Sequence, residues 1–90
     1  MEQEKAPSNI RIETQTMIYE VAEGICIQVT DRQTICLLRR HPAIGKRFVG
    51  AIPIGKSVIN DRTPAIGEQA CFHSSGAPFI TGAVTRVQRR

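Results

Sequence analysis

Tryptophan is absent from the sequence and leucine nearly so, with two residues, whereas isoleucine occurs twelve times, valine six and threonine seven. β-Branched side chains lose rotamer freedom in a helix and pack well on a pleated sheet. Because a helical core would use leucine as its main filler, this balance favours a mainly β protein. The chain has 90 residues, so we expect one domain with a shallow core.

Long apolar runs are also missing, and no stretch reaches the 18 residues that a membrane-spanning segment needs. The first residues are polar and acidic, which is unlike a signal peptide, so we expect a cytoplasmic protein. Cys26, Cys36 and Cys71 are odd in number, and in a reducing compartment they predict free thiols rather than a disulfide framework.

Acidic residues are scarce in the second part of the chain. Residues 1–31 carry six acids and two bases, a net charge of −4, whereas residues 32–90 carry ten bases and two acids, a net charge of +8. This asymmetry predicts an anionic partner for the basic part. The alternative is a folded dipole with both charges on a solvated surface.

The N-terminal part divides into a leader and the start of a sheet. Residues 1–8 are predicted to be a disordered leader, and residues 9–90 a single small domain. Residues 9–14 alternate apolar and polar side chains, which indicates a strand. Residues 14–23 are ambiguous between strand and helix. A short helix with Gly24 as its C-terminal cap is slightly favoured, because four apolar side chains fall on one helical face: Met17, Ile18, Val21 and Ala22.

Residues 25–40 are typical of a β-hairpin with its turn at Asp31–Gln33. Pairing Thr30 with Thr34 places one set of side chains on the core face: Ile25, Ile27, Val29, Ile35 and Leu37. The opposite face then carries Cys26, Gln28, Cys36 and Leu38, which a further element or a partner chain would cover.

Proline and glycine punctuate the rest of the chain. Pro42, Pro53 and Pro64 recur every 11 residues, each followed by an Ile-Gly pair and a charged residue, which predicts three turns that feed strands. Gly76 is predicted to take a positive φ in a further turn, and Gly82 to bend the last strand. The predicted fold is therefore a small SH3-like or OB-like barrel of five to six short strands.

The segment Gly50–Ser57 spells G-x-x-x-x-G-K-S, the pattern of a phosphate-binding loop. Such a loop needs a helix after it, whereas the following residues are few, β-branched and ended by Pro64. Pro53 also has no N–H to offer a phosphate. The segment is therefore interpreted as a turn with Lys56 in solvent.

Catalytic and metal-binding patterns are weak. Cys71 and His73 form the only close pair of zinc ligands, and no C-x₂-C pair is present. With Asp61 they could make a Cys-His-acid set only if the fold gathered them in a pocket. We expect no enzyme activity, no metal and no cofactor.

The basic residues therefore carry the main functional hypothesis, a non-catalytic module that contacts nucleic acid or a nucleic-acid-handling complex through its turns. The alternative is a protein-protein interaction module or inhibitor, such as a phage or plasmid encodes, acting through a sheet edge or an apolar face. An acidic protein surface or a second copy in a homodimer would be its partner. The candidate phosphate contacts are Arg39, Arg40, Lys46, Arg47, Lys56, Arg62 and Arg86, with Arg89 and Arg90 as further members of the basic set.

Overall fold

The computed structural model describes residues 9–89, and every regular element within them is a β-strand. The predicted leader and Arg90 lie outside these residues. Seven strands follow the order β7-β6-β5-β3-β2-β1-β8 in one antiparallel sheet, and β4 pairs with β3 outside this path. The mainly β class is confirmed, although eight strands replace the five or six expected: β1 (Ile10–Thr14), β2 (Met17–Ala22), β3 (Ile25–Asp31), β4 (Cys36–Leu37), β5 (Arg47–Ile52), β6 (Gln69–His73), β7 (Phe79–Ile80) and β8 (Val84–Arg89).

The helix predicted within residues 14–23 is wrong, because residues 17–22 form strand β2. In β2 the buried side chains alternate, with Tyr19 and Val21 facing the core. These two residues pair with Ile12 and Ile10 of β1, so both strands present their apolar side chains to one face. The core face of β1 thus imposes a period of two on a segment whose own pattern fits either structure.

Gly24 serves a hairpin turn instead of a helix cap. Ala22 pairs with Ile25, so the β2–β3 connection has two residues, Glu23 and Gly24. Their φ angles are 51° and 80°, the two positive values that a type I′ turn requires. The side chain of Asn9 supports the turn, since its Oδ1 accepts a hydrogen bond of 2.8 Å from the Glu23 N–H.

The β3–β4 hairpin exists, but its predicted register is wrong. Thr30 pairs with Leu37 rather than Thr34, and Asp31 pairs with Cys36, so residues 32–35 form the turn. This four-residue turn replaces the three-residue turn expected at residues 31–33.

The assignment of faces on this hairpin is also wrong, and a bulge explains part of the error. On the β2 side, Gln28 pairs with Glu20 and Cys26 with Val21, which leaves Ile27 without a register partner. A bulge shifts the alternation of side chains by one residue. Cys26 and Val29 are therefore both buried, whereas three residues predicted for the core are exposed: Ile27, Ile35 and Leu37.

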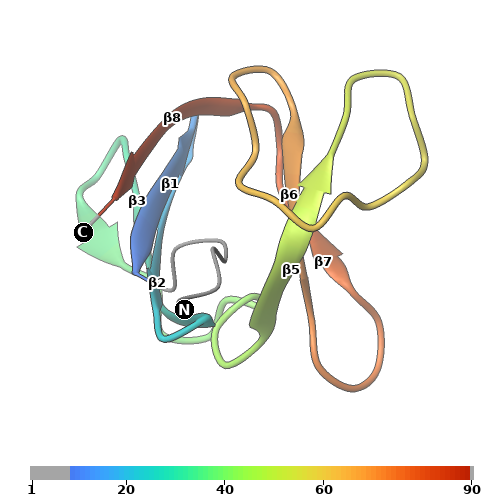
Figure 1. Cartoon of the computed structure of the whole chain (residues 1–90). Coiled ribbons are helices and arrows are strands. Elements are labelled where there is room, and N and C mark those ends of the chain that lie inside the picture. Colours follow the sequence, from blue (N-terminus) through green and yellow to red (C-terminus); the bar gives the residue numbers. More distant parts are fainter. Residues whose placement is uncertain (1–8, 90) are drawn as a thin grey trace, which may run out of the picture.

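The core lies where the sheet bends over itself. Figure 1 shows β8 running from the β6 side to lie beside β1, so that one strand bridges two groups of strands. At the start of β8, the Val84 N–H donates to Glu68 O and the Gly67 N–H donates to Val84 O, each at 2.7 Å. The bend buries one cluster of side chains: Ile10, Ile12, Tyr19, Val21, Cys26, Val29, Ala43, Ala70, Phe72 and Val84.

Aromatic rings connect the two groups of strands. His41 packs edge-on against Phe79 of β7 with ring centroids 4.8 Å apart, and against Tyr19 of β2 at 5.6 Å. Tyr19 in turn stacks on Phe72 of β6 at 5.8 Å. The Nδ1 atom of His41 accepts a 3.0 Å hydrogen bond from the Ala43 N–H, and burial lowers the pKa of the imidazole below its usual 6.5.

Candidate interaction surface

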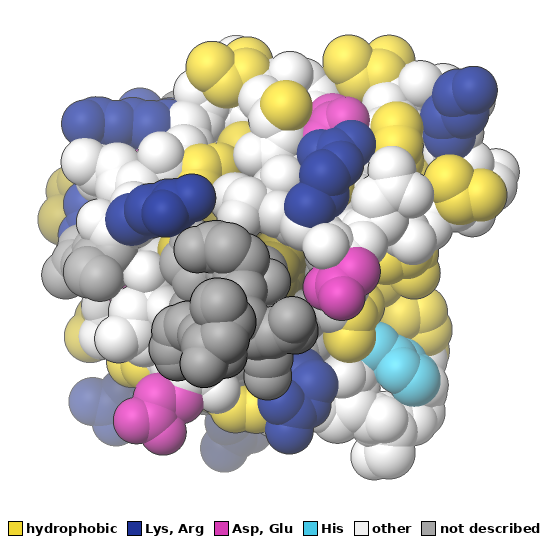
Figure 2. Space-filling view, in the orientation of Figure 1, with side chains coloured by type: hydrophobic (Ala, Val, Ile, Leu, Met, Phe, Trp, Pro, Cys, Tyr) yellow, Lys and Arg dark blue, Asp and Glu magenta, His cyan; other side chains and the backbone are white. Residues whose placement is uncertain are grey.

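The seven candidate phosphate contacts lie in four parts of the structure. Arg39 and Arg40 form a turn after β4, Lys46 directly precedes β5, and Arg47 is its first residue. The others are separate, because Lys56 and Arg62 belong to the long β5–β6 loop and Arg86 to β8. Figure 2 shows Lys and Arg side chains dispersed over one face of the molecule, separated by uncharged surface.

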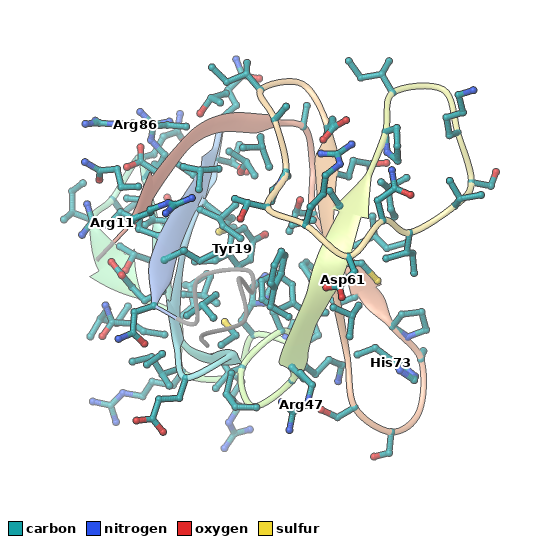
Figure 3. The ribbon with its side chains drawn as sticks, in the orientation of Figure 1. Arg11, Tyr19, Arg47, Asp61, His73 and Arg86 are labelled. Atoms are coloured by element: carbon teal, nitrogen blue, oxygen red, sulfur yellow. The ribbon has the colours of Figure 1, made fainter. Side chains whose placement is uncertain are left out.

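Figure 3 shows how far the set is divided. Arg86 lies with Arg11 on the side formed by β8 and β1, whereas Arg47 lies at the lower end of β5. The seven residues therefore do not all belong to one basic patch.

Arg62 is engaged in the structure of its own loop. Its guanidinium forms two hydrogen bonds with the Glu68 carboxylate, at 2.6 and 2.8 Å, and this carboxylate also accepts the Ala65 N–H at 2.8 Å. Hydrogen bonding to Arg62 and to the Ala65 amide lowers the pKa of Glu68 to about 2. Arg62 would have to give up this bidentate pair before it could bind a phosphate.

Four of the bases lie within one segment, residues 38–47. Backbone hydrogen bonds hold both ends of this segment against β3, from Leu38 N–H to Val29 O and from Gly45 N–H to Cys26 O, each at 2.8 Å. Among residues 9–89, no ion pair involves the four bases: Arg39, Arg40, Lys46 and Arg47.

Beside this segment, the β3–β4 hairpin exposes three large aliphatic side chains. Ile27 is 58% exposed, Leu37 59% and Ile35 73%. We call these three residues, together with Arg39 and Arg40, the hairpin surface. All three aliphatic residues belong to one hairpin, Ile27 to β3, Ile35 to the turn and Leu37 to β4. A contiguous apolar patch on a small protein marks a surface that another molecule covers more often than isolated exposed side chains do.

Ile35 also has an unfavourable backbone conformation. Its φ is 56°, in the left-handed region that β-branched residues avoid. The turn that holds it is well fixed, because the Ile35 N–H donates to Asp31 O at 2.8 Å and the Asp31 carboxylate accepts the N–H groups of Gln33 and Thr34. An isoleucine here costs about 1–2 kcal/mol relative to a residue that tolerates this conformation.

The G-x-x-x-x-G-K-S segment has a structural explanation. A Cβ at Gly50 would collide with the backbone carbonyl of Asn60, which pairs with Ala51 through two hydrogen bonds of 2.7 and 2.8 Å. The first glycine therefore admits a neighbouring backbone instead of a phosphate. Within the described chain no helix follows Ser57, so Lys56 has no helix N-terminus beside it.

The three Ile-Gly units form the same turn. In each unit the N–H of the charged residue donates to the carbonyl three residues earlier, at 3.0 or 3.1 Å, and the glycine has φ between 73° and 94°. This pattern is that of a type II turn. The first and third units lead into β5 and β6, whereas the second leads into the long loop: Ala43–Lys46, Pro53–Lys56 and Ala65–Glu68.

The cysteines and histidines are not gathered into a site. All three cysteines are free, and no group of three or more metal-ligating side chains occurs within residues 9–89. Burial raises the pKa of the Cys26 thiol to about 11 and also raises that of Cys71. His73 is exposed, and its Nε2 lies 3.0 Å from Gly76 O. The φ angle of Gly76 is 81°, positive as the sequence predicted for this turn.

Comparison of the chain with protein-family models, curated proteins and solved structures found no match. Across residues 9–89 there is no helix with the length and apolar character needed to cross a membrane.

The sequence did not point to the hairpin surface, because its three aliphatic residues were expected in the core. One signal was available. The turn after Asp31 contains no glycine or asparagine, although a residue with positive φ is common at the end of such turns.

Proposed function

We propose that the protein is a non-catalytic binding module whose hairpin surface contacts another protein. The observation that carries the proposal is Ile35, an exposed β-branched side chain in a left-handed backbone conformation. Backbone strain persists where the surrounding structure enforces it, and it concentrates at functional positions. The strained residue here is an isoleucine whose side chain is exposed to solvent. Such a side chain contributes little to the core and is available to contact a partner.

The dispersal of the bases supports a protein partner over nucleic acid. Phosphate binding by all seven residues would need them on one face, whereas Arg86 and Arg47 lie on different sides of the molecule (Figure 3). The sheet edges are less suitable than the hairpin surface. Edge strand β7 has two residues, and edge strand β8 carries Arg86 and Arg89, charges of the kind that disfavour strand addition.

The state of the thiols supports a non-catalytic role. A thiol with a pKa near 11, such as that of Cys26, is almost fully protonated at neutral pH and is a poor nucleophile. Burial also raises the pKa of Cys71, and the thiol of the exposed Cys36 donates to the Thr34 carbonyl at 3.6 Å rather than to a histidine.

The test uses immobilised protein and an extract of the cells that express it. Wild type, Ile35→Asn and Ile54→Asn are compared, since Ile54 is a similarly exposed isoleucine, at 71%, in the distant β5–β6 loop. A recovered protein is then purified and titrated by calorimetry. The proposal expects binding by wild type and Ile54→Asn that Ile35→Asn weakens by about tenfold. Equal binding to all three variants would contradict it.

A second candidate, favoured by the bases around residues 38–47, is phosphate-led binding of nucleic acid. The contacts would be Arg39, Arg40, Lys46 and Arg47, which lie on one segment and form no ion pairs within the described residues. Titration of labelled single-stranded and duplex DNA at two salt concentrations tests this, because phosphate contacts weaken as salt rises. Absence of binding at low salt would reject nucleic acid as the partner.

We also propose that the sheet closes into a small barrel of the SH3-like or OB-like kind. Strand β8 pairs with β1 at one end of the strand order. Its first residue, Val84, also hydrogen-bonds with Gly67 and Glu68, which directly precede β6 near the other end, and these bonds support closure. Closure removes exposed sheet edges, which a short chain otherwise leaves open. Nuclear Overhauser contacts between the Gly67 and Val84 backbones in solution would test it.

A further inference from the structure

We infer that the hairpin surface binds an acidic segment of a partner protein that also carries aliphatic side chains. This inference rests on the proposed function and adds the chemistry of the partner. Three observations carry it: the charge around the surface, the aliphatic residues within it, and the location of the aromatic rings elsewhere.

The charge around the hairpin surface is mainly positive. From Arg32 to Asn60 the sequence contains six bases and no acid. The acid just before this stretch, Asp31, uses its carboxylate to accept two backbone N–H groups in the turn. On the neighbouring strands β1 and β2, Glu13 and Glu20 both lie against Arg11, at 3.9 and 2.7 Å. Arg39 and Arg40 are exposed, and they form no ion pair within residues 9–89.

A partner that complements this charge must supply carboxylates or phosphates. The aliphatic side chains favour carboxylates on a polypeptide. Ile27, Ile35 and Leu37 gain free energy when apolar surface covers them, about 25 cal/mol per Å² removed from water. A nucleic acid offers little aliphatic surface in return, whereas a peptide of alternating acidic and aliphatic residues matches both features.

The aromatic residues also disfavour nucleic acid on this surface. Single-stranded nucleic acid is usually bound by stacking its bases on exposed aromatic rings. All four aromatic side chains of the chain pack in or against the core, and none belongs to the hairpin surface: Tyr19, Phe48, Phe72 and Phe79. Phosphates bound there would be held by arginines alone.

A second copy of this chain is a poor occupant as well. A two-fold interface pairs one patch with the same patch on the other copy. The hairpin surface would then bring its arginines near those of the second copy, and like charges oppose association. The inferred occupant is therefore a different, acidic chain.

The test is selection of random 12-residue peptides displayed on phage against the wild-type protein. Selected peptides are synthesised, and their affinities are measured for wild type, Arg39→Glu/Arg40→Glu, Ile35→Asn and two matched controls. Arg86→Glu is the charge control on β8, and Ile54→Asn is the control for an exposed isoleucine. A labelled single-stranded DNA is measured in parallel. Ile35→Asn is expected to relieve backbone strain, and circular dichroism of each variant checks that a loss of binding does not come from unfolding.

We expect peptides enriched in Asp or Glu together with Ile, Leu or Val. Their binding should weaken by about tenfold or more in each hairpin variant and change less than about twofold in the controls. Basic or neutral peptides that still depend on Ile35 would overturn the acidic partner and leave the protein-binding proposal standing. Recovery of no Ile35-dependent peptide would contradict the proposed function itself. DNA binding that outcompetes the peptides would replace the polypeptide with nucleic acid.

Discussion

At the scale of single residues, Gly50 and Ile35 differ in how well the amino acid fits its backbone conformation. Gly50 is where the fold needs a residue without a Cβ, because the Asn60 backbone occupies that space. Ile35 is where the fold would prefer glycine or asparagine, since its φ is 56°, yet a β-branched residue is present. Apart from the lack of glycine or asparagine in the turn after Asp31, the sequence gives no direct sign of this difference, because both conformations depend on contacts formed in the folded chain.

Replacing Ile35 with asparagine should stabilise the protein. Asparagine tolerates the left-handed conformation, and the 73% exposed isoleucine side chain buries little surface, so we expect a gain of about 1 kcal/mol. Urea unfolding followed by circular dichroism measures the change. Ile35→Val is the matched control, because it keeps the β-branch and should give almost no gain. Lower stability of Ile35→Asn would show that the isoleucine contributes contacts to the fold.

At the scale of elements, the sequence indicated strands and turns well and faces less well. The alternation in residues 9–14, the positive φ of Gly76 and the Ile-Gly turns follow from local sequence, and the structure contains them. The faces of the β3–β4 hairpin do not, because the bulge at Ile27 is specified by pairing with β2. The hairpin surface was missed because of this bulge at Ile27, and because the four-residue turn moves Ile35 and Leu37 away from their predicted partners.

The β5–β6 loop should depend on Gly50 more than on any turn glycine within it. Gly50→Ala places a Cβ against Asn60 and should destabilise the protein by about 2–4 kcal/mol. Gly55→Ala is the matched control, because its φ is also positive, at 73°, while its surroundings are open. We expect that control to lose only about 1–2 kcal/mol. Thermal unfolding of both variants compares them, and equal losses would refute the close approach of Asn60.

At the scale of the whole molecule, His41 joins parts that the strand order sets apart. Its ring contacts Tyr19 of β2 and Phe79 of the edge strand β7. The charge separation along the sequence did not produce a single basic face, because the bases of residues 32–90 are spread over several turns and strands. Composition alone predicted the fold class, whereas the positions of the charges on the surface could be determined only from the folded structure.

Stability should fall on mild acidification because of His41. Burial lowers the pKa of the folded imidazole, so the unfolded chain binds a proton more readily than the folded one. The stabilisation is complete above the unfolded pKa of about 6.5 and is lost as the pH falls from there through the lowered folded pKa. Urea unfolding at pH 7.5 and pH 5 measures the loss, and His41→Gln should reduce it. The same loss in His41→Gln would assign the pH dependence to other groups.

The approach of Asn60 to Gly50 has a consequence for how short motifs are understood. A chain can be selected to place glycine, four residues and a further glycine with lysine and serine simply because one backbone crosses another and a tight turn follows. Two unrelated physical demands then converge on the same letters. Asking what would fill the space of the missing Cβ distinguishes them: a nucleotide in one fold, the chain's own backbone in this one.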